Sequence, residues 1–419
     1  MNHKPRVLFS LILVLLVVFS AGNAQATNGY FSHGFGAVYK ALAGAGVAFP
    51  RSAFVAAINP AGMAMVGKRY EVEVALFNPN RDFTVTGNPS GFPGTFGLAP
   101  GKVESESTLF AIPGFAGNWT VGDNATFGLV LYGNGGMNTD YASPVFGFAP
   151  TGVDLSQLFI APTYAVKVSD HHAIGVSGII AMQRFRAQGL TAFGQFSSDP
   201  ENLTDNGHTN SFGGGVRVGY LGELNPAFSV GASFQSKIYM GKLDDYAGLF
   251  AEQGGFDVPA NWTIGVVAKP NPNVAILFDV QQIYYSDIVS INNPLLPNLQ
   301  TSQLGNDDGA GFGWEDVTVF KIGSEFGTEG PWDFRVGFST TDQPIPSSEM
   351  VFNILAPGVV EQHLTFGFTR EFGGGKDVSV AVTRAFSKTV SGPNTLEAPG
   401  QQEIELRMDQ WEFAINFGF

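Results

Sequence analysis

The chain contains no cysteine, which excludes a disulfide framework, a thiolate metal site and a thiol nucleophile. It is also poor in charge, because Asp, Glu, Lys and Arg make up only 14% of its 419 residues. Long apolar runs are scarce as well: apart from residues 7–19, no stretch approaches the about 20 residues of a membrane-spanning helix. If this chain enters a membrane, it therefore crosses the bilayer with strands.

Basic residues are the minority among the charges. The sequence has 22 Lys and Arg against 36 Asp and Glu, a formal net charge of −14, and this balance disfavours nucleic acid as a partner. The 6 histidines have no zinc-site spacing, and neither a G-x-S-x-G elbow nor a Walker loop occurs. The run 306–309 (NDDG) lacks the spacing of an EF-hand and is interpreted as a solvated loop. We therefore expect no metal, no cofactor and no enzymatic activity.

Residues 1–26 have the pattern of a cleavable export signal. A polar and basic start precedes the apolar run 7–19, and Ala24-Gln25-Ala26 supplies the small-x-small cleavage pattern. The apolar run is 13 residues long, too short to span a bilayer. We expect an exported chain that begins near Thr27.

From Tyr70 onward, apolar residues alternate with small or polar ones at the period of a β-strand. For example, Trp332, Phe334 and Val336 alternate with Asp333 and Arg335. The pattern predicts fourteen strands, at 70–86, 105–121, 124–139, 155–169, 172–188, 207–223, 226–242, 256–269, 273–288, 313–327, 331–341, 359–372, 376–388 and 404–419. Their connections alternate between six short turns and seven long loops. This layout is typical of a transmembrane β-barrel of the outer membrane, whereas a soluble sandwich gives no reason for strict alternation.

The last predicted strand ends in an aromatic residue. Apolar side chains occupy every second position: Trp411, Phe413, Ile415, Phe417 and Phe419. A C-terminal aromatic residue resembles the assembly signal of bacterial outer-membrane barrels, so we expect the barrel-assembly machinery to be a partner through Phe419.

The same strand changes phase near Asp409. Upstream of this residue, Ile404, Leu406 and Met408 take the apolar positions and charged residues take the others. One explanation places these three side chains in an apolar upper lumen, where they would contact a ligand. The alternative is a β-bulge that restores the phase.

Residues 27–67 precede the first strand and are rich in glycine and alanine, so their backbone can pack closely against surrounding walls. The segment has neither a period of two nor a long amphipathic helix, and it ends at Asn59-Pro60-Ala61-Gly62. We interpret it as a plug inside a barrel. An ordinary N-terminal subdomain is the alternative.

This segment resembles the hatch of the FadL/TodX family of outer-membrane channels. The most specific similarity is NGYFSHGFGAVYKALAGAGVAF followed by Asn59, Pro60 and Ala61, and the resemblance extends from about Thr27 to Phe419. It implies a fourteen-stranded antiparallel barrel (68–419) plugged by a hatch (27–67). It also implies import of long-chain fatty acids or, in some members, aromatic hydrocarbons, with a sideways exit at a kink in the third strand. Here that strand contains Gly133, Asn134, Gly135 and Gly136, which permit a bend, although a glycine-rich strand end is the alternative.

Two further groups of residues are candidates for substrate contact. A capture groove is predicted from apolar side chains in the loops after the third and fifth strands: Phe146, Phe148, Leu155, Leu190, Phe193 and Phe196. A lumen site for a carboxylate is predicted from inward-facing bases: Arg217, Lys237, Lys321 and Arg335. Lumen acids such as Glu71, Glu73, Asp279 and Asp333 are alternative partners for these bases.

We therefore expect a passive, hatch-gated outer-membrane channel for hydrophobic small molecules, with long-chain fatty acids as the substrate and outer-membrane lipid and lipopolysaccharide around a monomeric barrel. The alternatives are an aromatic-hydrocarbon channel of the same family, a barrel-embedded lipid hydrolase, and a structural or adhesive barrel.

Overall fold

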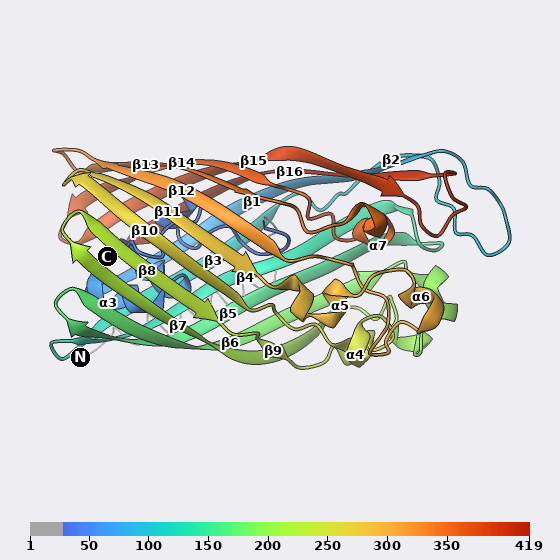
Figure 1. Ribbon diagram of the computed structural model, residues 1–419, viewed down its shortest axis with the longest axis horizontal. Coiled ribbons are helices and arrows are strands. Elements are labelled where there is room, and N and C mark those ends of the chain that lie inside the picture. The colour runs from blue at the N-terminus through green and yellow to red at the C-terminus, as the bar shows by residue number, and fades with distance from the viewer. Residues whose placement is uncertain (1–27) are drawn as a thin grey trace, which may run out of the picture.

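The computed structural model describes residues 28–419, so the predicted export signal lies outside the described residues. One antiparallel sheet of 16 strands closes on itself, because the last strand pairs with the first over the register Glu71↔Gly418 to Thr86↔Glu403 (Figure 1). Two short strands, β2 (Gly101–Glu104) and β9 (Tyr239–Met240), are additions beside β1 and β7. The wall itself therefore has fourteen strands, as predicted.

The wall strands are β1 (Arg69–Thr86), β3 (Phe110–Val121), β4 (Ala125–Pro144), β5 (Pro150–Ser169), β6 (His172–Gln188), β7 (Thr209–Asn225), β8 (Phe228–Gln235), β10 (Asn261–Asn271), β11 (Val274–Ile283), β12 (Val317–Gly327), β13 (Trp332–Thr341), β14 (Gln362–Gly373), β15 (Lys376–Pro393) and β16 (Glu403–Gly418). The helices are α2 (Ala37–Lys40), η1 (Ala53–Ala57), η2 (Pro60–Gly62), α3 (Met63–Val66), η3 (Thr191–Phe196), η4 (Pro200–Asn202), η5 (Asp244–Tyr246), α4 (Ala251–Gly254), η6 (Tyr285–Asp287), α5 (Val289–Asn292), α6 (Asn298–Thr301), η7 (Ser347–Glu349) and α7 (Met350–Asn353). Among the described residues, none of these helices has both the length and the hydropathy needed to span a bilayer.

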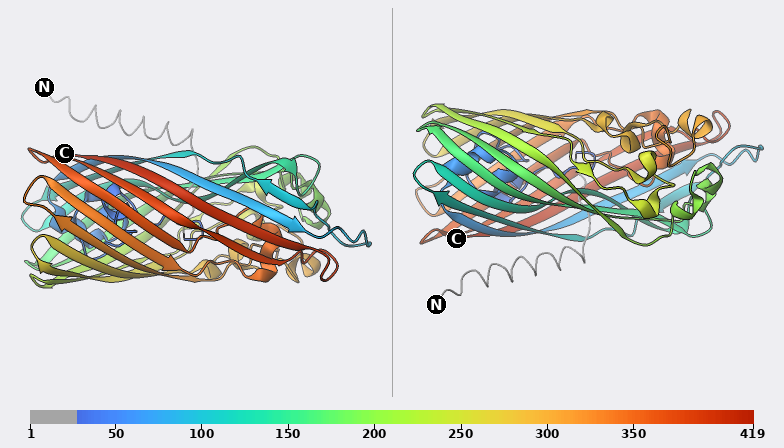
Figure 2. Two further views of the ribbon diagram at one scale, coloured as in Figure 1. Left: turned by 90° about the horizontal axis from the view of Figure 1, so that it is seen from above. Right: turned by 90° about the horizontal axis from the view of Figure 1, so that it is seen from below.

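The two ends of the barrel differ. Tight turns and the C-terminus lie at one end, whereas the long loops fold into a compact cap at the other (Figures 1 and 2). Several predicted strands end at the wrong residue. The seventh was predicted at 226–242, but β8 stops at Gln235, because the alternation continues into a loop whose apolar residues, such as Ile238, pack inside the cap. A period of two therefore locates a strand better than it locates its end.

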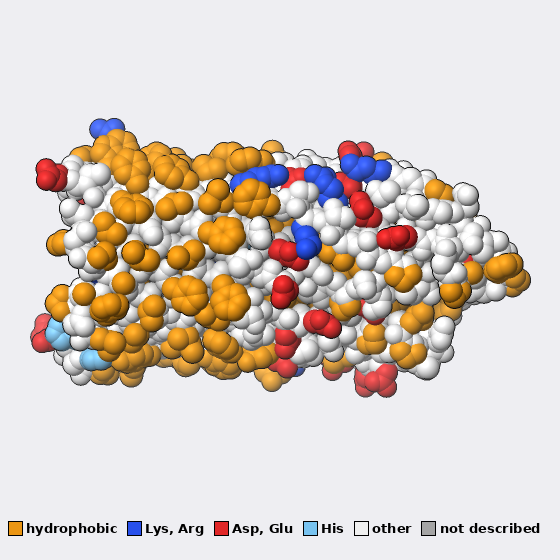
Figure 3. Space-filling view, turned by 45° about the horizontal axis from the view of Figure 1, so that its top comes forward, with side chains coloured by type: hydrophobic (Ala, Val, Ile, Leu, Met, Phe, Trp, Pro, Cys, Tyr) orange, Lys and Arg blue, Asp and Glu red, His pale blue; other side chains and the backbone are white. Residues whose placement is uncertain are grey.

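The outer face carries an apolar belt over the half of the barrel nearer the tight turns (Figure 3). Exposed apolar side chains from almost every strand build it, including Val74, Leu76, Val216, Val218, Ile264, Val266, Phe278, Phe320, Ile322, Phe366, Phe413, Ile415 and Phe417. A band of acidic and basic side chains follows the belt toward the loops (Figure 3). This arrangement is what a strand wall needs in order to face lipid below and water above.

The edge of the belt explains the phase change in β16. Even-numbered residues face inward along the whole strand, and its register with β1 continues without a bulge. Below Asp409 the outward side chains are apolar; above it they are charged, while Ile404, Leu406 and Met408 are buried inside. The three side chains therefore face the lumen, and their contact with a ligand stays a prediction. The pairing of β16 with its other neighbour, β15, contains a bulge, but the extra residue belongs to β15, between Ala385 and Lys388.

The belt leads to a first prediction. Replacing Ile415 with arginine puts a charge in the middle of the apolar stripe of β16, and we expect the folded barrel to lose about 2–4 kcal/mol of unfolding free energy in lipid vesicles. Denaturant titration of vesicle-inserted protein measures this loss. Glu405→Arg, on the same face but within the charged band, should change stability by less than about 1 kcal/mol. Equal losses in the two variants would contradict the belt.

The lumen in the belt half is filled by Asn28–Gly67, which we call the hatch (Figure 1). Inward-facing glycines of the wall let the hatch approach closely, since a Cβ on any of them would overlap or crowd a hatch atom: Gly128, Gly175, Gly219, Gly231, Gly323, Gly337 and Gly367. Within the hatch, Gly44 has φ 78°, and a Cβ there would overlap the carbonyl of His33. The small inward residues of the strands thus match a space occupied by backbone rather than by water.

Candidate functional site

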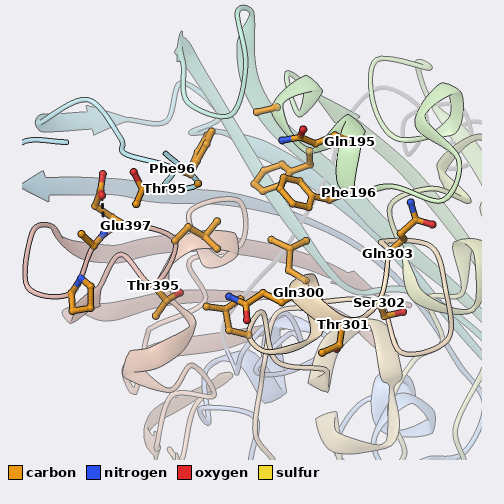
Figure 4. Close-up of a pocket in the computed structure, with 18 residues that line it drawn as sticks. Thr95, Phe96, Gln195, Phe196, Gln300, Thr301, Ser302, Gln303, Thr395 and Glu397 are labelled. Carbon is orange, nitrogen blue, oxygen red and sulfur yellow. Dashed lines mark hydrogen bonds between the residues drawn. The ribbon is translucent and has the colours of Figure 1, made fainter. Parts of the chain in front are cut away.

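The cap of loops contains an open groove with a volume of about 980 Å³ (Figure 4). Four connections line it: Gly94–Phe96 after β1, Ala192–Phe196 after β6, Leu296–Gln303 after β11, and Thr395–Pro399 after β15. Phe96 and Phe196 lie on one side, and Gln300, Thr301 and Thr395 lie on the other (Figure 4). An apolar wall with a few polar side chains is the usual composition of a small-molecule site.

The predicted groove residues separate into three groups. Phe193 and Phe196 line the groove, and the ring of Phe146 packs behind them, 5.4 Å from that of Phe193. Leu155 and Leu190 are buried deeper. Phe148 is 99% exposed and contributes nothing to the groove, so its inclusion was wrong. Sequence reasoning missed the opposite wall, because 296–303 and 395–399 are mostly small or polar and show no period.

The groove is nearly uncharged. Glu397 is the one charged side chain that lines it among the described residues, and its carboxylate accepts hydrogen bonds from Ser90 and from the backbone N–H of Ala398. The lining therefore offers apolar contact and neutral hydrogen-bonding groups to an incoming molecule. The lining contains no cation that would attract the carboxylate of a molecule entering the groove.

Contacting aromatic side chains connect the groove to the hatch. A small cavity of about 30 Å³ beneath the groove is lined by Phe185, Phe193, Phe250 and Phe352, among other apolar residues. The ring of Phe250 lies 4.8 Å from that of Phe256, which lies 6.3 Å from Tyr30 of the hatch. The chain of apolar surface thus runs from the cap to the first residues of the hatch.

The hatch is held by buried polar contacts with the wall. Lys40 forms an ion pair with Glu412 of β16, and both side chains are almost completely buried. Asp279 of β11 accepts hydrogen bonds from the backbone N–H groups of Gly46 (2.7 Å) and Val47 (2.9 Å). Hatch backbone and charge are thus satisfied by wall side chains, as burial requires.

The Asn59-Pro60-Ala61 turn is seated against the wall strands β6 and β7. The amide of Asn59 donates to the carbonyl oxygens of Val47 (2.7 Å) and Tyr220 (2.8 Å), and its oxygen caps η2 by accepting from Ala61 (3.1 Å). Wall glycines of β6 and β7 receive Asn59 and Pro60 at close range. At Asn134–Gly136, the third wall strand is contacted by Tyr30, Phe31 and Ser32 of the hatch.

The third wall strand, β4, is irregular at Gly133–Gly136. Its register with β5 shifts by one residue between Gly133 and Gly135, so Asn134 is the extra residue of a bulge. A Cβ on Gly135 would overlap the carbonyl oxygen of Tyr30, so only glycine permits this approach. The backbone of Ser32 donates to Asn134 (2.9 Å), and that of Gly136 donates to Tyr30 (3.0 Å). The hatch therefore pairs with β4 like a short extra strand.

The ladder between β3 and β4 stops beside this bulge. The two strands pair from Val121↔Ala125 only as far as Phe115↔Leu131, whereas β4 pairs with β5 as far as Pro144. Farther up, Glu106 donates to the carbonyl of Asp140. We call the intervening edge of β4, residues 132–139, the β3–β4 interruption.

The four predicted lumen bases have different surroundings. Arg217 and Lys321 line one small cavity beside the hatch together with Asn134. Arg335 forms an ion pair with Glu325 (2.6 Å). This base therefore has a lumen acid as its partner, which was the alternative to binding a substrate carboxylate. Lys237 lies beyond the end of β8, partly exposed, with its ammonium 5.2 Å from the exposed ring of Tyr239. Its placement in the lumen was wrong, because β8 is shorter than predicted.

One pair of side chains bears on the hydrolase alternative. The hydroxyl of Ser339 lies 3.2 Å from Nδ1 of His363, and both residues are buried in the lumen. The other ring nitrogen of His363 has no hydrogen-bond partner among the described residues, so the acid of a triad is missing. The ring of His363 stacks on His33 of the hatch, 5.5 Å away, and does not face the bilayer.

A closed strand barrel with an apolar belt, an internal hatch and an apolar route toward it is an outer-membrane channel for hydrophobic compounds. The chain belongs to the outer membrane protein transport protein family (OMPP1/FadL/TodX), whose model matches residues 14–417. Members of this family are passive transport channels of the bacterial outer membrane and not enzymes. The predicted resemblance is confirmed.

Solved structures share the fold at low sequence identity. The Pseudomonas putida toluene transporter TodX has a TM-score of 0.69 at 16% identity, covering 92% of this chain and 98% of that one. A Pseudomonas aeruginosa FadL homologue has a TM-score of 0.70 at 15% identity, with coverages of 93% and 99%. The Ralstonia pickettii toluene transporter TbuX has a TM-score of 0.63 at 18% identity, covering 92% of this chain and 98% of that one. No curated protein sequence matches this chain.

Proposed function

We propose that the protein imports long-chain fatty acids through the outer membrane, by capture in the loop groove, passage along the contacting rings and sideways exit at the β3–β4 interruption. The observation that carries this proposal is the unbroken series of apolar contacts from the groove to Tyr30, which pairs with β4 at the bulge. A vertical route would have to cross the hatch, which is packed tightly against the wall.

Sideways exit is supported by the edge of β4. Pro113 lies in the part of β3 that pairs with β1 alone, and proline is usual where a strand lacks a second partner. If the hatch residues Tyr30–Ser32 leave the edge of β4, residues 132–139 of β4 have no ladder hydrogen bonds to β3. A hydrophobic molecule then passes from the lumen into lipid without entering water.

The size of the groove favours a long chain. A volume of 980 Å³ is at the upper end of small-molecule sites, which range over about 300–1,000 Å³, and is far more than a single aromatic ring needs. The second candidate is an aromatic hydrocarbon. It is favoured by the uncharged lining of the groove and by the solved structures named as toluene transporters.

Assembly and surroundings follow from the surface. We propose that Phe419, whose backbone pairs with Tyr70 at the seam of the barrel, is the residue that the barrel-assembly machinery recognises. The apolar belt contacts membrane lipid, and the charged band above it lies at the height of lipopolysaccharide head groups. The barrel closes within one chain, in keeping with a monomer.

The capture step is tested by two matched phenylalanines. Phe196 lines the groove and is 38% exposed, whereas Phe148 is 99% exposed and lies outside it. We expect Phe196→Glu to lower uptake of dilute oleate about tenfold, since it replaces apolar contact worth about 1.5 kcal/mol or more with a charge that repels the carboxylate. Phe148→Glu should leave uptake unchanged. Uptake of labelled oleate and toluene by cells lacking their own channel measures both variants, and equal behaviour of the two variants would contradict capture at the groove.

A further inference from the structure

Most cations in the lumen of this barrel have a carboxylate partner. Lys40 pairs with Glu412, Arg51 and Arg335 with Glu325, and Arg69 with Glu71. Arg217, Lys321 and Arg81 of β1 form no ion pair within the described part of the chain, and of these three only Arg81 has a buried nitrogen without a hydrogen-bond partner there. Arg81 faces inward and is 4% exposed.

The guanidinium of Arg81 is only partly satisfied. Nη1 donates to the carbonyl oxygen of Asn138 in β4 (2.5 Å), and Nη2 is buried without any hydrogen-bond partner. The neighbouring carboxylate, Asp82, points outward to Arg407 (2.8 Å) and Lys102 (3.5 Å). An unpaired buried charge destabilises the folded protein unless an anion compensates it.

The position of Arg81 relates this charge to the proposed exit. Arg81 reaches from β1 to Asn138, across the place where β3 no longer separates β1 from β4, and so lies at the upper end of the β3–β4 interruption. At the same height the outer face carries Arg407 and Asp409, directly above the apolar belt. Arg81 therefore lies close to the level at which a lipid head group meets water.

A small cavity lies beside the guanidinium. The residues that line it with Arg81 are Gly29 of the hatch, Met137, Asn138, Trp314, Ala356–Gly358 and Met408. None of them is charged. Its volume of about 10 Å³ is enough for about one water molecule. A larger anion needs Gly29 or Ala356–Gly358 to move aside, and Gly29 belongs to the segment that must leave β4 for sideways exit.

We propose that Arg81 binds the carboxylate of the transported molecule at the upper end of the exit, so that the hydrocarbon chain lies below it at the height of the apolar belt. This inference rests on the proposed exit and deepens it, because it names the residue by which the exit favours an amphipathic monoanion over a neutral hydrocarbon. Nη2 is the donor that the ligand satisfies, and the paired charge-assisted hydrogen bonds of arginine suit a carboxylate.

The test compares a fatty acid with its ester. We expect the purified protein in lipid nanodiscs to bind cis-parinaric acid about tenfold more tightly than methyl parinarate, the margin of one good charge-assisted hydrogen bond. Arg81→Met should abolish this preference by weakening the acid alone. Arg407→Met, at the same height on the outer face, should keep it. Heat-modifiable migration of each barrel confirms folding.

The outcomes separate this inference from the proposed function. If acid and ester bind the wild-type protein equally, or if Arg81→Met keeps the preference for the acid, the assignment of Arg81 is wrong while hydrophobic transport stands. If neither ligand binds and neither oleate nor toluene is taken up, the proposed function itself fails. An Arg81→Met barrel that does not fold is replaced by Arg81→Gln, which retains hydrogen-bond donors but no charge, and the same comparison of acid with ester decides the question.

Discussion

A Lys40→Met variant is expected to leak. The substitution leaves the buried Glu412 without its lysine partner and, among the described residues, with only Nδ1 of His33 nearby, at 3.5 Å, and loss of one partner of a buried ion pair costs about 3–5 kcal/mol. This cost destabilises only the docked state of the hatch, because water reaches Glu412 once the hatch leaves the lumen. The undocked population should therefore rise by about two to four orders of magnitude. Planar-bilayer conductance and sensitivity of cells to large polar antibiotics measure the leak.

The control removes the second charge as well. In Lys40→Met/Glu412→Leu, no unpaired carboxylate is buried, so hatch docking should recover to near that of the wild-type protein. A barrel that stays closed in the single variant would show that other contacts, such as those of Asp279 with Gly46 and Val47, hold the hatch unaided. Equal leakage in both variants would assign the effect to lost packing and not to charge.

The wall of this protein could be predicted from sequence because one physical rule fixes each strand position. Each residue faces either the outside or the lumen, and the two directions alternate along the whole of β16. The alternation continues at Asp409, where the apolar side chains change from the outer face to the inner face. What changes there is the surroundings: lipid gives way to water outside, and the polar hatch contacts give way to apolar loops inside. The end of β8 could not be predicted, because Ile238 alternates as a wall residue would but packs inside the cap.

The candidate site was only partly predictable. Glycines mark the bulge of β4, since backbone approach to Tyr30 leaves no room for a side chain. Phe148 and Phe196 are the same residue type in similar loops, and only the folded cap exposes one and places the other in the groove. Arg81 is an odd-numbered residue of β1, like the inward-facing Glu71 and Glu73, so its inward direction could be predicted from the alternation. The lack of a hydrogen-bond partner for its Nη2 is visible only in the folded structure.

Deleting Asn134 is expected to close the proposed exit. Without the extra residue, β4 keeps one register with β5 from Ala125 to Tyr141, and its edge is free to continue the ladder with β3 beyond Phe115↔Leu131. We expect uptake of oleate to fall about tenfold or more, which corresponds to a barrier higher by about 1.4 kcal/mol. Uptake is measured per folded barrel in the outer membrane, so that a lower yield of protein is not mistaken for a closed exit.

A second bulge of the same wall supplies the control. β15 also shifts its register by one residue, between Ala385 and Lys388, but its ladder with β16 continues on both sides of this bulge. Deleting Ser387 straightens β15 and should leave uptake unchanged if the bulge of β4 has a specific role. A fall of the same size in both variants would mean that either deletion merely disturbs the barrel. Normal uptake after deletion of Asn134 would instead indicate that the substrate passes the hatch and leaves through the periplasmic end of the barrel. In that case Lys40→Met should raise oleate uptake together with the leak.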